Sequence, residues 1–139
     1  MIPLVLCIDD DKVTLMLCKI VLKRNLFCSD VITAENGEIA LQYFENQLTL
    51  PEAERNIPAL VLLDLNMPVV DGWGFLDQFA QKYLPVFPNV KVVILSSSIN
   101  PADTSKAQEY HTVLTFLSKP LEAHNLTSLQ ENPALSAFF

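Results

Sequence analysis

Short apolar segments alternate with amphipathic segments five times along this chain, and this alternation constrains the fold more than any other feature. The apolar segments are rich in Val, Ile and Leu, as expected of strands that are buried on both faces. We expect strands at residues 3–8, 27–33, 57–63, 90–95 and 112–117. We expect helices at residues 11–24, from 36, at 71–83, from 101 and at 121–130. This order predicts an α/β fold with a doubly wound, five-stranded parallel sheet and helices on both faces.

The first two expected helices each have an apolar side. Lysines form one stripe of the first helix, and a set of large apolar residues forms the other side. That set is Val13, Met16, Leu17, Ile20 and Val21. In the second helix the apolar face consists of Ile39, Ala40, Tyr43 and Phe44. Asn25 is expected to end the first helix, and Asn100 with Pro101 to begin the fourth.

Length and composition narrow the class of protein. The 139 residues fit one domain, 1–139, and half of them are hydrophobic, which is enough for a core. The net charge of −7 argues against nucleic acid and against anionic membranes as partners. No apolar run approaches the length of a membrane span, and no secretory signal is recognisable. Three widely spaced cysteines indicate buried, reduced thiols in a cytoplasmic protein.

Polar residues follow four of the five expected strands. They are Asp9 and Asp10 after the first, Asp64 and Asn66 after the third, Ser96 to Ser98 after the fourth, and Ser118, Lys119 and Pro120 after the fifth. In open parallel sheets, sites lie beyond the carboxyl ends of the strands, so these groups are expected to converge at one edge.

Such a cluster suits phosphoryl chemistry. Three carboxylates repel one another unless a hard cation lies among them, and an all-oxygen donor set favours Mg²⁺. Asp64 ends the most apolar strand and is the natural nucleophile towards phosphorus, giving an aspartyl phosphate. Lys119 and the hydroxyl of Ser96 would bind phosphoryl oxygens. Each motif alone has an ordinary explanation as a cap, a turn or a surface group, so the prediction depends on their combination.

The residues also resemble a known family. The segments IDDDK (8–12), LLDLNMPVVDGWGFL (62–76), VVILSSS (92–98) and FLSKPL (116–121) are similar to those of the receiver domain of bacterial two-component response regulators. The resemblance covers nearly the whole chain. It implies a flavodoxin-like, CheY-like fold with strand order 2-1-3-4-5, and a phosphoacceptor that signals by changing its protein-binding surface.

The resemblance also assigns roles around the metal. Asp64 would be the phosphoacceptor and a ligand of Mg²⁺. Asp10 would bind the ion directly, Asp9 would act through water, and the backbone carbonyl of Asn66 would be a further ligand.

Further roles fall on the fourth and fifth strands. Ser96 and Phe116 would be the switch residues, with phenylalanine replacing the family's frequent tyrosine and lacking its hydroxyl. Lys119 would contact the phosphoryl group, and the Lys119–Pro120 peptide bond would be cis. Ser98, with Asn66, would flank the path of the water that hydrolyses the acyl phosphate.

The implied partners are proteins. A sensor histidine kinase or a histidine phosphotransferase would supply the phosphoryl group, and a downstream protein would read the result. Self-catalysed phosphotransfer and autodephosphorylation would be the only chemistry, so the chain would not be an enzyme. A weak homodimer through the fourth helix, fifth strand and fifth helix is possible, since Lys106, Glu109 and Ser118 lie on that face.

Three other functions remain open at this point. A Mg²⁺-dependent phosphohydrolase with an aspartyl nucleophile needs a second acid where the chain has Asn66. A flavin carrier needs hydroxyls and glycine where the chain has Asp9, Asp10 and Asp11. A degenerate receiver could act only as a binding module, although all the acids and Lys119 are present.

Overall fold

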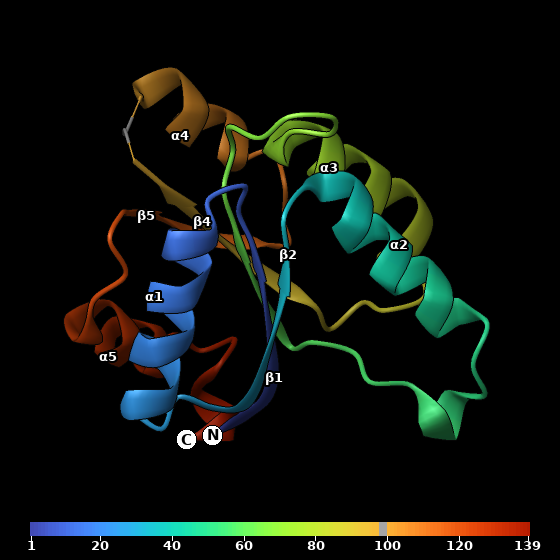
Figure 1. Ribbon diagram of the computed structural model, residues 1–139, viewed down its shortest axis with the longest axis horizontal. Coiled ribbons are helices and arrows are strands. Elements are labelled where there is room, and N and C mark those ends of the chain that lie inside the picture. Colours follow the sequence, from blue (N-terminus) through green and yellow to red (C-terminus); the bar gives the residue numbers. More distant parts are fainter. Residues whose placement is uncertain (98–99) are drawn as a thin grey trace.

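The computed structural model describes residues 1–97 and 100–139. Its centre is a parallel sheet in the order β2-β1-β3-β4-β5 (Figure 1). The strands are β1 (Ile2–Ile8), β2 (Cys28–Ala34), β3 (Leu60–Leu63), β4 (Lys91–Ser96) and β5 (Val113–Ser118). The α-helices are α1 (Lys12–Arg24), α2 (Gly37–Leu48), α3 (Gly72–Gln78), α4 (Pro101–Ala107) and α5 (Ala123–Glu131). The predicted fold class and strand order are therefore confirmed.

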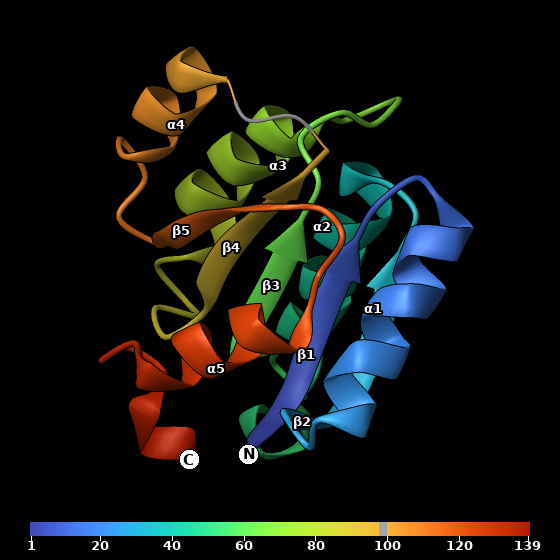
Figure 2. The same ribbon diagram turned by 90° about the vertical axis from the view of Figure 1, so that its left-hand side faces the viewer.

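Helices cover both faces of the sheet (Figure 2). On one face α1 and α5 pack over a core that includes Leu22 and Leu126. On the other face α2 and α3 enclose an aromatic cluster around Phe44, whose ring centroid lies 4.9 Å from that of Phe79. All four of these side chains are at most 1% exposed, so the two cores hold the sheet between them and fix where its strands end.

The predicted apolar side of α1 is wrong. Four of its members are exposed, namely Val13 (57%), Met16 (55%), Leu17 (48%) and Ile20 (42%). Leu15, Cys18 and Leu22 face the core instead. Helical periodicity shows that a helix has apolar stripes, but α1 has two of them, and only its docking on β1 selects between them. The same correction applies to Ile39 of α2, which is 48% exposed.

The end of α1 has an unusual residue. Asn25 is the C-cap, as predicted, but Leu26 follows it with φ at 53°. The N–H of Leu26 donates to the carbonyl of Lys23, and the N–H of Phe27 donates to that of Leu22, at 3.1 and 3.0 Å. This pair of bonds is the Schellman motif, in which glycine usually occupies the left-handed position.

Several expected boundaries shift. The third strand is expected from residue 57 but begins at Leu60. The single helix expected at 71–83 consists of α3 followed by a π-helical turn, η2 (Phe79–Tyr83). Short 3₁₀ turns also form at η1 (Glu52–Glu54) and η3 (Ser136–Phe138).

The segment after α5 returns to the start of β1. Leu135 is fully buried, and the amino group of Met1 donates to the carbonyl of Phe138 at 2.6 Å. Both termini therefore lie at the end of the sheet opposite the carboxyl ends of the strands (Figure 2). In the described part of the chain, no helix has the length and apolar character needed to span a bilayer.

Candidate functional site

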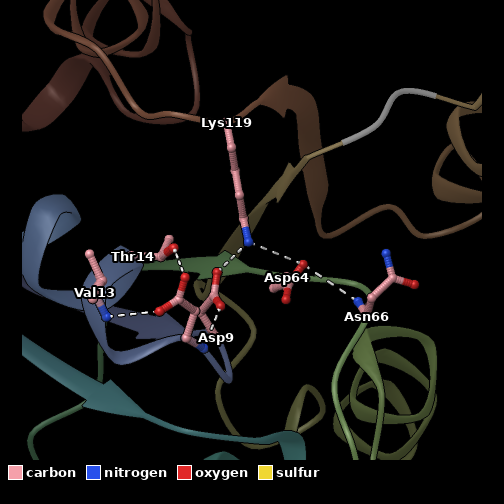
Figure 3. Close-up of polar contacts among 7 residues, drawn as sticks. Asp9, Val13, Thr14, Asp64, Asn66 and Lys119 are labelled. Atoms are coloured by element: carbon pink, nitrogen blue, oxygen red, sulfur yellow. Dashed lines mark hydrogen bonds and ion pairs between the residues drawn. The ribbon is translucent and has the colours of Figure 1, made fainter.

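Three charged side chains meet at the carboxyl ends of three strands (Figure 3). Asp9 follows β1, Asp64 follows β3 and Lys119 follows β5. The Nζ of Lys119 lies 2.6 Å from Oδ2 of Asp9 and 3.5 Å from Oδ1 of Asp64. Segments more than 50 residues apart in the sequence thus place two carboxylates around one ammonium group.

Both carboxylates are buried, with Asp9 4% and Asp64 5% exposed. Burial raises the pKa of Asp64, the charge of Asp9 raises it further, and Lys119 opposes both. For Lys119 burial lowers the pKa, but the hydrogen bond and charge of Asp9, together with Asp64, outweigh it, so the pKa is raised overall. The lysine therefore stays protonated at neutral pH and holds the two acids together.

A third acid completes a possible metal site. Asp9, Asp10 and Asp64 each offer a carboxylate oxygen, and these atoms lie within 4.8 Å of one another. Asp10 is exposed, whereas the other two are buried. Oxygen donors without sulfur or imidazole suit Mg²⁺, which binds few protein ligands and keeps several waters. The donor set therefore fits the predicted ion.

Asn66 lies beside the cluster in the loop after β3. It is exposed, and its backbone N–H approaches Oδ1 of Asp64 at 3.5 Å. This contact supplies a weak donor to the carboxylate, at the upper limit of hydrogen-bond distance.

A close contact fixes the shape of this loop. A Cβ added to Gly72 would lie 2.6 Å from the carbonyl oxygen of Asp64 and 2.7 Å from Cα of Leu65. The N–H of Gly72 donates to the carbonyl of Leu65 at 3.0 Å, and Asp71 caps α3 by accepting from the N–H of Gly74 at 2.8 Å. Glycine is thus required because the start of α3 rests directly on the backbone of Asp64.

The ends of β4 and β5 are joined beside the acids. Ser96 is 1% exposed, and its carbonyl accepts from the N–H of Lys119 at 2.8 Å. The Lys119–Pro120 peptide bond is cis. Ser98, expected beside the water path, lies outside the described residues.

Phe116 is half-buried in β5. It lines a hollow of about 250 Å³ between α4 and β5, together with residues that include Thr104, Ala107 and Gln108. Phe116 therefore lies next to free volume beside α4.

Asp11 is the N-cap of α1. Its carboxylate caps α1 by accepting from the N–H of Val13 and the hydroxyl of Thr14, both at 3.0 Å. Its own N–H donates to Oδ1 of Asp9 at 2.9 Å. Asp11 thus orients Asp9, and the signal in the sequence was an acid three residues before a threonine at a helix start.

Comparison with known proteins shows the family of this chain. The family model of the response regulator receiver domain matches residues 5–131. Response regulator Rcp1 of Synechocystis sp. is 31% identical over 115 residues, covering 83% of this chain and 75% of that protein. The probable methanogenesis regulatory protein FilR2 of Methanothrix harundinacea is 33% identical over 125 residues, covering 88% and 76%.

Solved structures show the same similarity. A two-component response regulator from Cytophaga hutchinsonii has a TM-score of 0.86 and 30% identity, covering 97% of this chain and 98% of that one. The Mn²⁺-bound form of Rcp1 has a TM-score of 0.71 and 27% identity, covering 96% and 90%. With a family match over most of its length, this chain belongs to the receiver domains of response regulators, which are signalling modules of two-component systems.

Proposed function

We propose that Asp64 accepts a phosphoryl group from a phosphohistidine on a sensor kinase or a histidine phosphotransferase. The observation that carries this proposal is the ammonium of Lys119 between the carboxylates of Asp9 and Asp64. In the transfer, an oxygen of Asp64 forms a bond to phosphorus. The phosphorus–nitrogen bond breaks, and its electron pair stays on the donor imidazole.

The other groups of the site have supporting roles. Lys119 would bind a phosphoryl oxygen while its Nζ keeps its contact with Asp9. Asp9 and Asp10, with Asp64 and the carbonyl of Asn66, would hold Mg²⁺, as the Mn²⁺-bound structure of the relative Rcp1 supports. When bound, the ion supplies positive charge that offsets both the repulsion among the acids and the charge of the phosphoryl group.

The switch would involve the neighbouring strands. We propose that the phosphoryl group draws the hydroxyl of Ser96 towards it and that the ring of Phe116 then turns into the hollow beside α4. The surface of α4, β5 and α5 would change, and a downstream protein would bind one of the two arrangements better.

The docking face for the phosphodonor is proposed to include α1. Its exposed apolar side, formed by Val13, Met16, Leu17 and Ile20, begins directly after the acids of the site. A helical partner could cover this side while presenting its histidine to Asp64.

We further propose that residues 1–139 act as one receiver domain in the cytoplasm. The burial of Leu135 supports including the segment after the matched residues. A weak homodimer through α4, β5 and α5 also remains a proposal. It cannot use Lys106 freely, because the Nζ of this residue lies 4.6 Å from the centroid of the Trp73 ring.

The direct test uses acetyl phosphate with and without Mg²⁺, read by intact mass. Wild type should gain one phosphoryl group only with Mg²⁺, and Asp64→Asn should gain none. Asp30→Asn is the matched control, because this acid is exposed on β2 and should not affect labelling. Mg²⁺-dependent labelling of Asp64→Asn at the same site would reject the assignment, and failure of wild type to label would favour a receiver that acts only as a binding module.

The hydrolase alternative has a specific weakness. Asn66 occupies the place of its second acid, and an amide cannot shuttle protons. Multiple turnovers on small phosphate esters would be needed to support that function.

A further inference from the structure

A group of four side chains joins α3 to α4, away from the acid cluster. Trp73 lies in the first turn of α3 and Asp77 near its end, whereas Lys106 lies at the end of α4 and Tyr110 in the segment after it. None of these residues has a role in the proposed phosphotransfer. We call this group the α3–α4 clamp.

Three contacts define the clamp. The rings of Trp73 and Tyr110 stack with centroids 5.9 Å apart and an interplanar angle of 25°. The Nζ of Lys106 lies 4.6 Å from the centroid of the Trp73 ring. The hydroxyl of Tyr110 donates to Oδ1 of Asp77 at 2.5 Å. An aromatic stack, a cation–π contact and a charge-assisted hydrogen bond therefore hold the two helices together.

The clamp is important because, among the described residues, few other contacts hold α4 in place. The helix has seven residues, and Ala107 is its one buried member. A hollow of about 250 Å³ separates part of it from β5. A short helix with so little buried surface can take another position when its side-chain contacts change.

The other end of the clamp is coupled to Asp64 by packing. Gly72 rests against the carbonyl oxygen of Asp64 and the backbone of Leu65, with no space even for a Cβ. Trp73 is the next residue. A shift of the backbone at Asp64 must therefore move the first turn of α3 and the Trp73 ring with it, since close-packed interiors transmit such displacements.

We propose that the α3–α4 clamp couples the phosphorylation site to the position of α4, through α3. This route passes through α3 and meets the one through Ser96 and Phe116 at α4. The clamp holds α4 where the hollow beside Phe116 stays open. A Phe116 ring that enters this hollow would meet Thr104 and Ala107, and a shift of α4 to accommodate the ring would disturb the contacts of Lys106 and Tyr110. The clamp thus favours the arrangement with the open hollow and opposes the switch.

The test is binding of beryllofluoride, a phosphoryl analogue, with Mg²⁺ to the full chain. Beryllofluoride should bind best to the switched arrangement, which the clamp opposes. A substitution that weakens the clamp lowers the free energy needed to reach that arrangement, so beryllofluoride should bind more tightly. We expect Lys106→Met and Tyr110→Phe each to lower the apparent Kd roughly 5-fold, as measured by fluorine NMR. Trp73 is the single tryptophan of the chain, so its emission should change on binding in wild type.

A second cluster provides matched controls. Lys82 lies 5.4 Å from the centroid of the Tyr83 ring, and the hydroxyl of Tyr83 donates to Glu45 at 2.8 Å. These contacts have the same chemistry but join α2 to η2. Lys82→Met and Tyr83→Phe should therefore leave the Kd within about twofold of wild type, below the range typical of coupled sites.

The outcomes separate this inference from the proposed function on which it rests. If wild type binds beryllofluoride but the clamp variants bind equally well or more weakly, the clamp is overturned and the phosphoacceptor assignment stands. A silent Trp73 in wild type that binds the analogue also overturns the clamp. If wild type does not bind the analogue, the proposed function fails, and the coupling fails with it.

Discussion

Removing the charge of Asp64 should stabilise the metal-free protein. At separations up to 4.8 Å and an effective dielectric constant near 20, repulsion from Asp9 costs about 3 kcal/mol. Attraction between the Nζ of Lys119 and Oδ1 of Asp64, at 3.5 Å and the same dielectric constant, contributes about 5 kcal/mol of the opposite sign. These terms partly cancel, and burial of the carboxylate decides the sign, in agreement with the raised pKa of Asp64, of which burial is the largest cause. We expect Asp64→Asn to increase the free energy of unfolding by about 1 kcal/mol, a size typical of single substitutions.

The pH dependence tests the cause of this gain. A carboxyl whose pKa is raised in the folded state favours folding only where it is protonated, and this contribution is lost as pH rises through the folded pKa. The stabilising effect of Asp64→Asn should therefore be larger at neutral pH and should narrow as the pH falls towards about 4, the usual carboxyl range.

The metal-free proteins are compared by urea denaturation in EDTA, at pH 7 and at about pH 4. This measures the difference in unfolding free energy between wild type and Asp64→Asn. A separate series without EDTA measures the effect of Mg²⁺. Mg²⁺ should stabilise wild type more than the variant, by about 1.4 kcal/mol at ten times its Kd. Asp30→Asn, an exposed acid on β2, is the control and should change stability by less than about 0.5 kcal/mol. A less stable Asp64→Asn protein, or a gap that does not depend on pH, would refute the electrostatic explanation.

Three further predictions concern the fold. Leu26→Gly should stabilise the protein by about 0.5–1 kcal/mol, because φ is 53° and the side chain is 70% exposed. Leu26→Ala keeps the unfavourable φ and should show no such gain in urea denaturation. Gly72→Ala should lower stability by about 2 kcal/mol or more and slow labelling by acetyl phosphate, since its Cβ would lie 2.6 Å from the carbonyl oxygen of Asp64. Normal labelling of a stable Gly72→Ala protein would contradict this contact. Burial and the hydrogen bond to Asp77 raise the pKa of Tyr110 to about 12, so wild-type stability should fall between about pH 10 and 12. Tyr110→Phe should flatten that fall, and an unchanged slope would contradict it.

The sequence by itself determined the architecture and the set of candidate site residues. Strands that are buried on both faces must be apolar, so the alternation of apolar and amphipathic segments predicts a parallel sheet. In such a sheet the residues that follow the strands lie at one edge. For this reason the sequence alone identifies Asp9, Asp64 and Lys119 as neighbours at that edge.

Only the tertiary structure decided how surfaces face one another. The sequence could not choose between the two apolar stripes of α1, because docking on β1 sets the rotation of the helix. Nor could it place Lys106 over Trp73, since that contact depends on the relative positions of α3 and α4. Periodicity depends on neighbours along the chain, whereas these contacts depend on packing between segments far apart in the sequence.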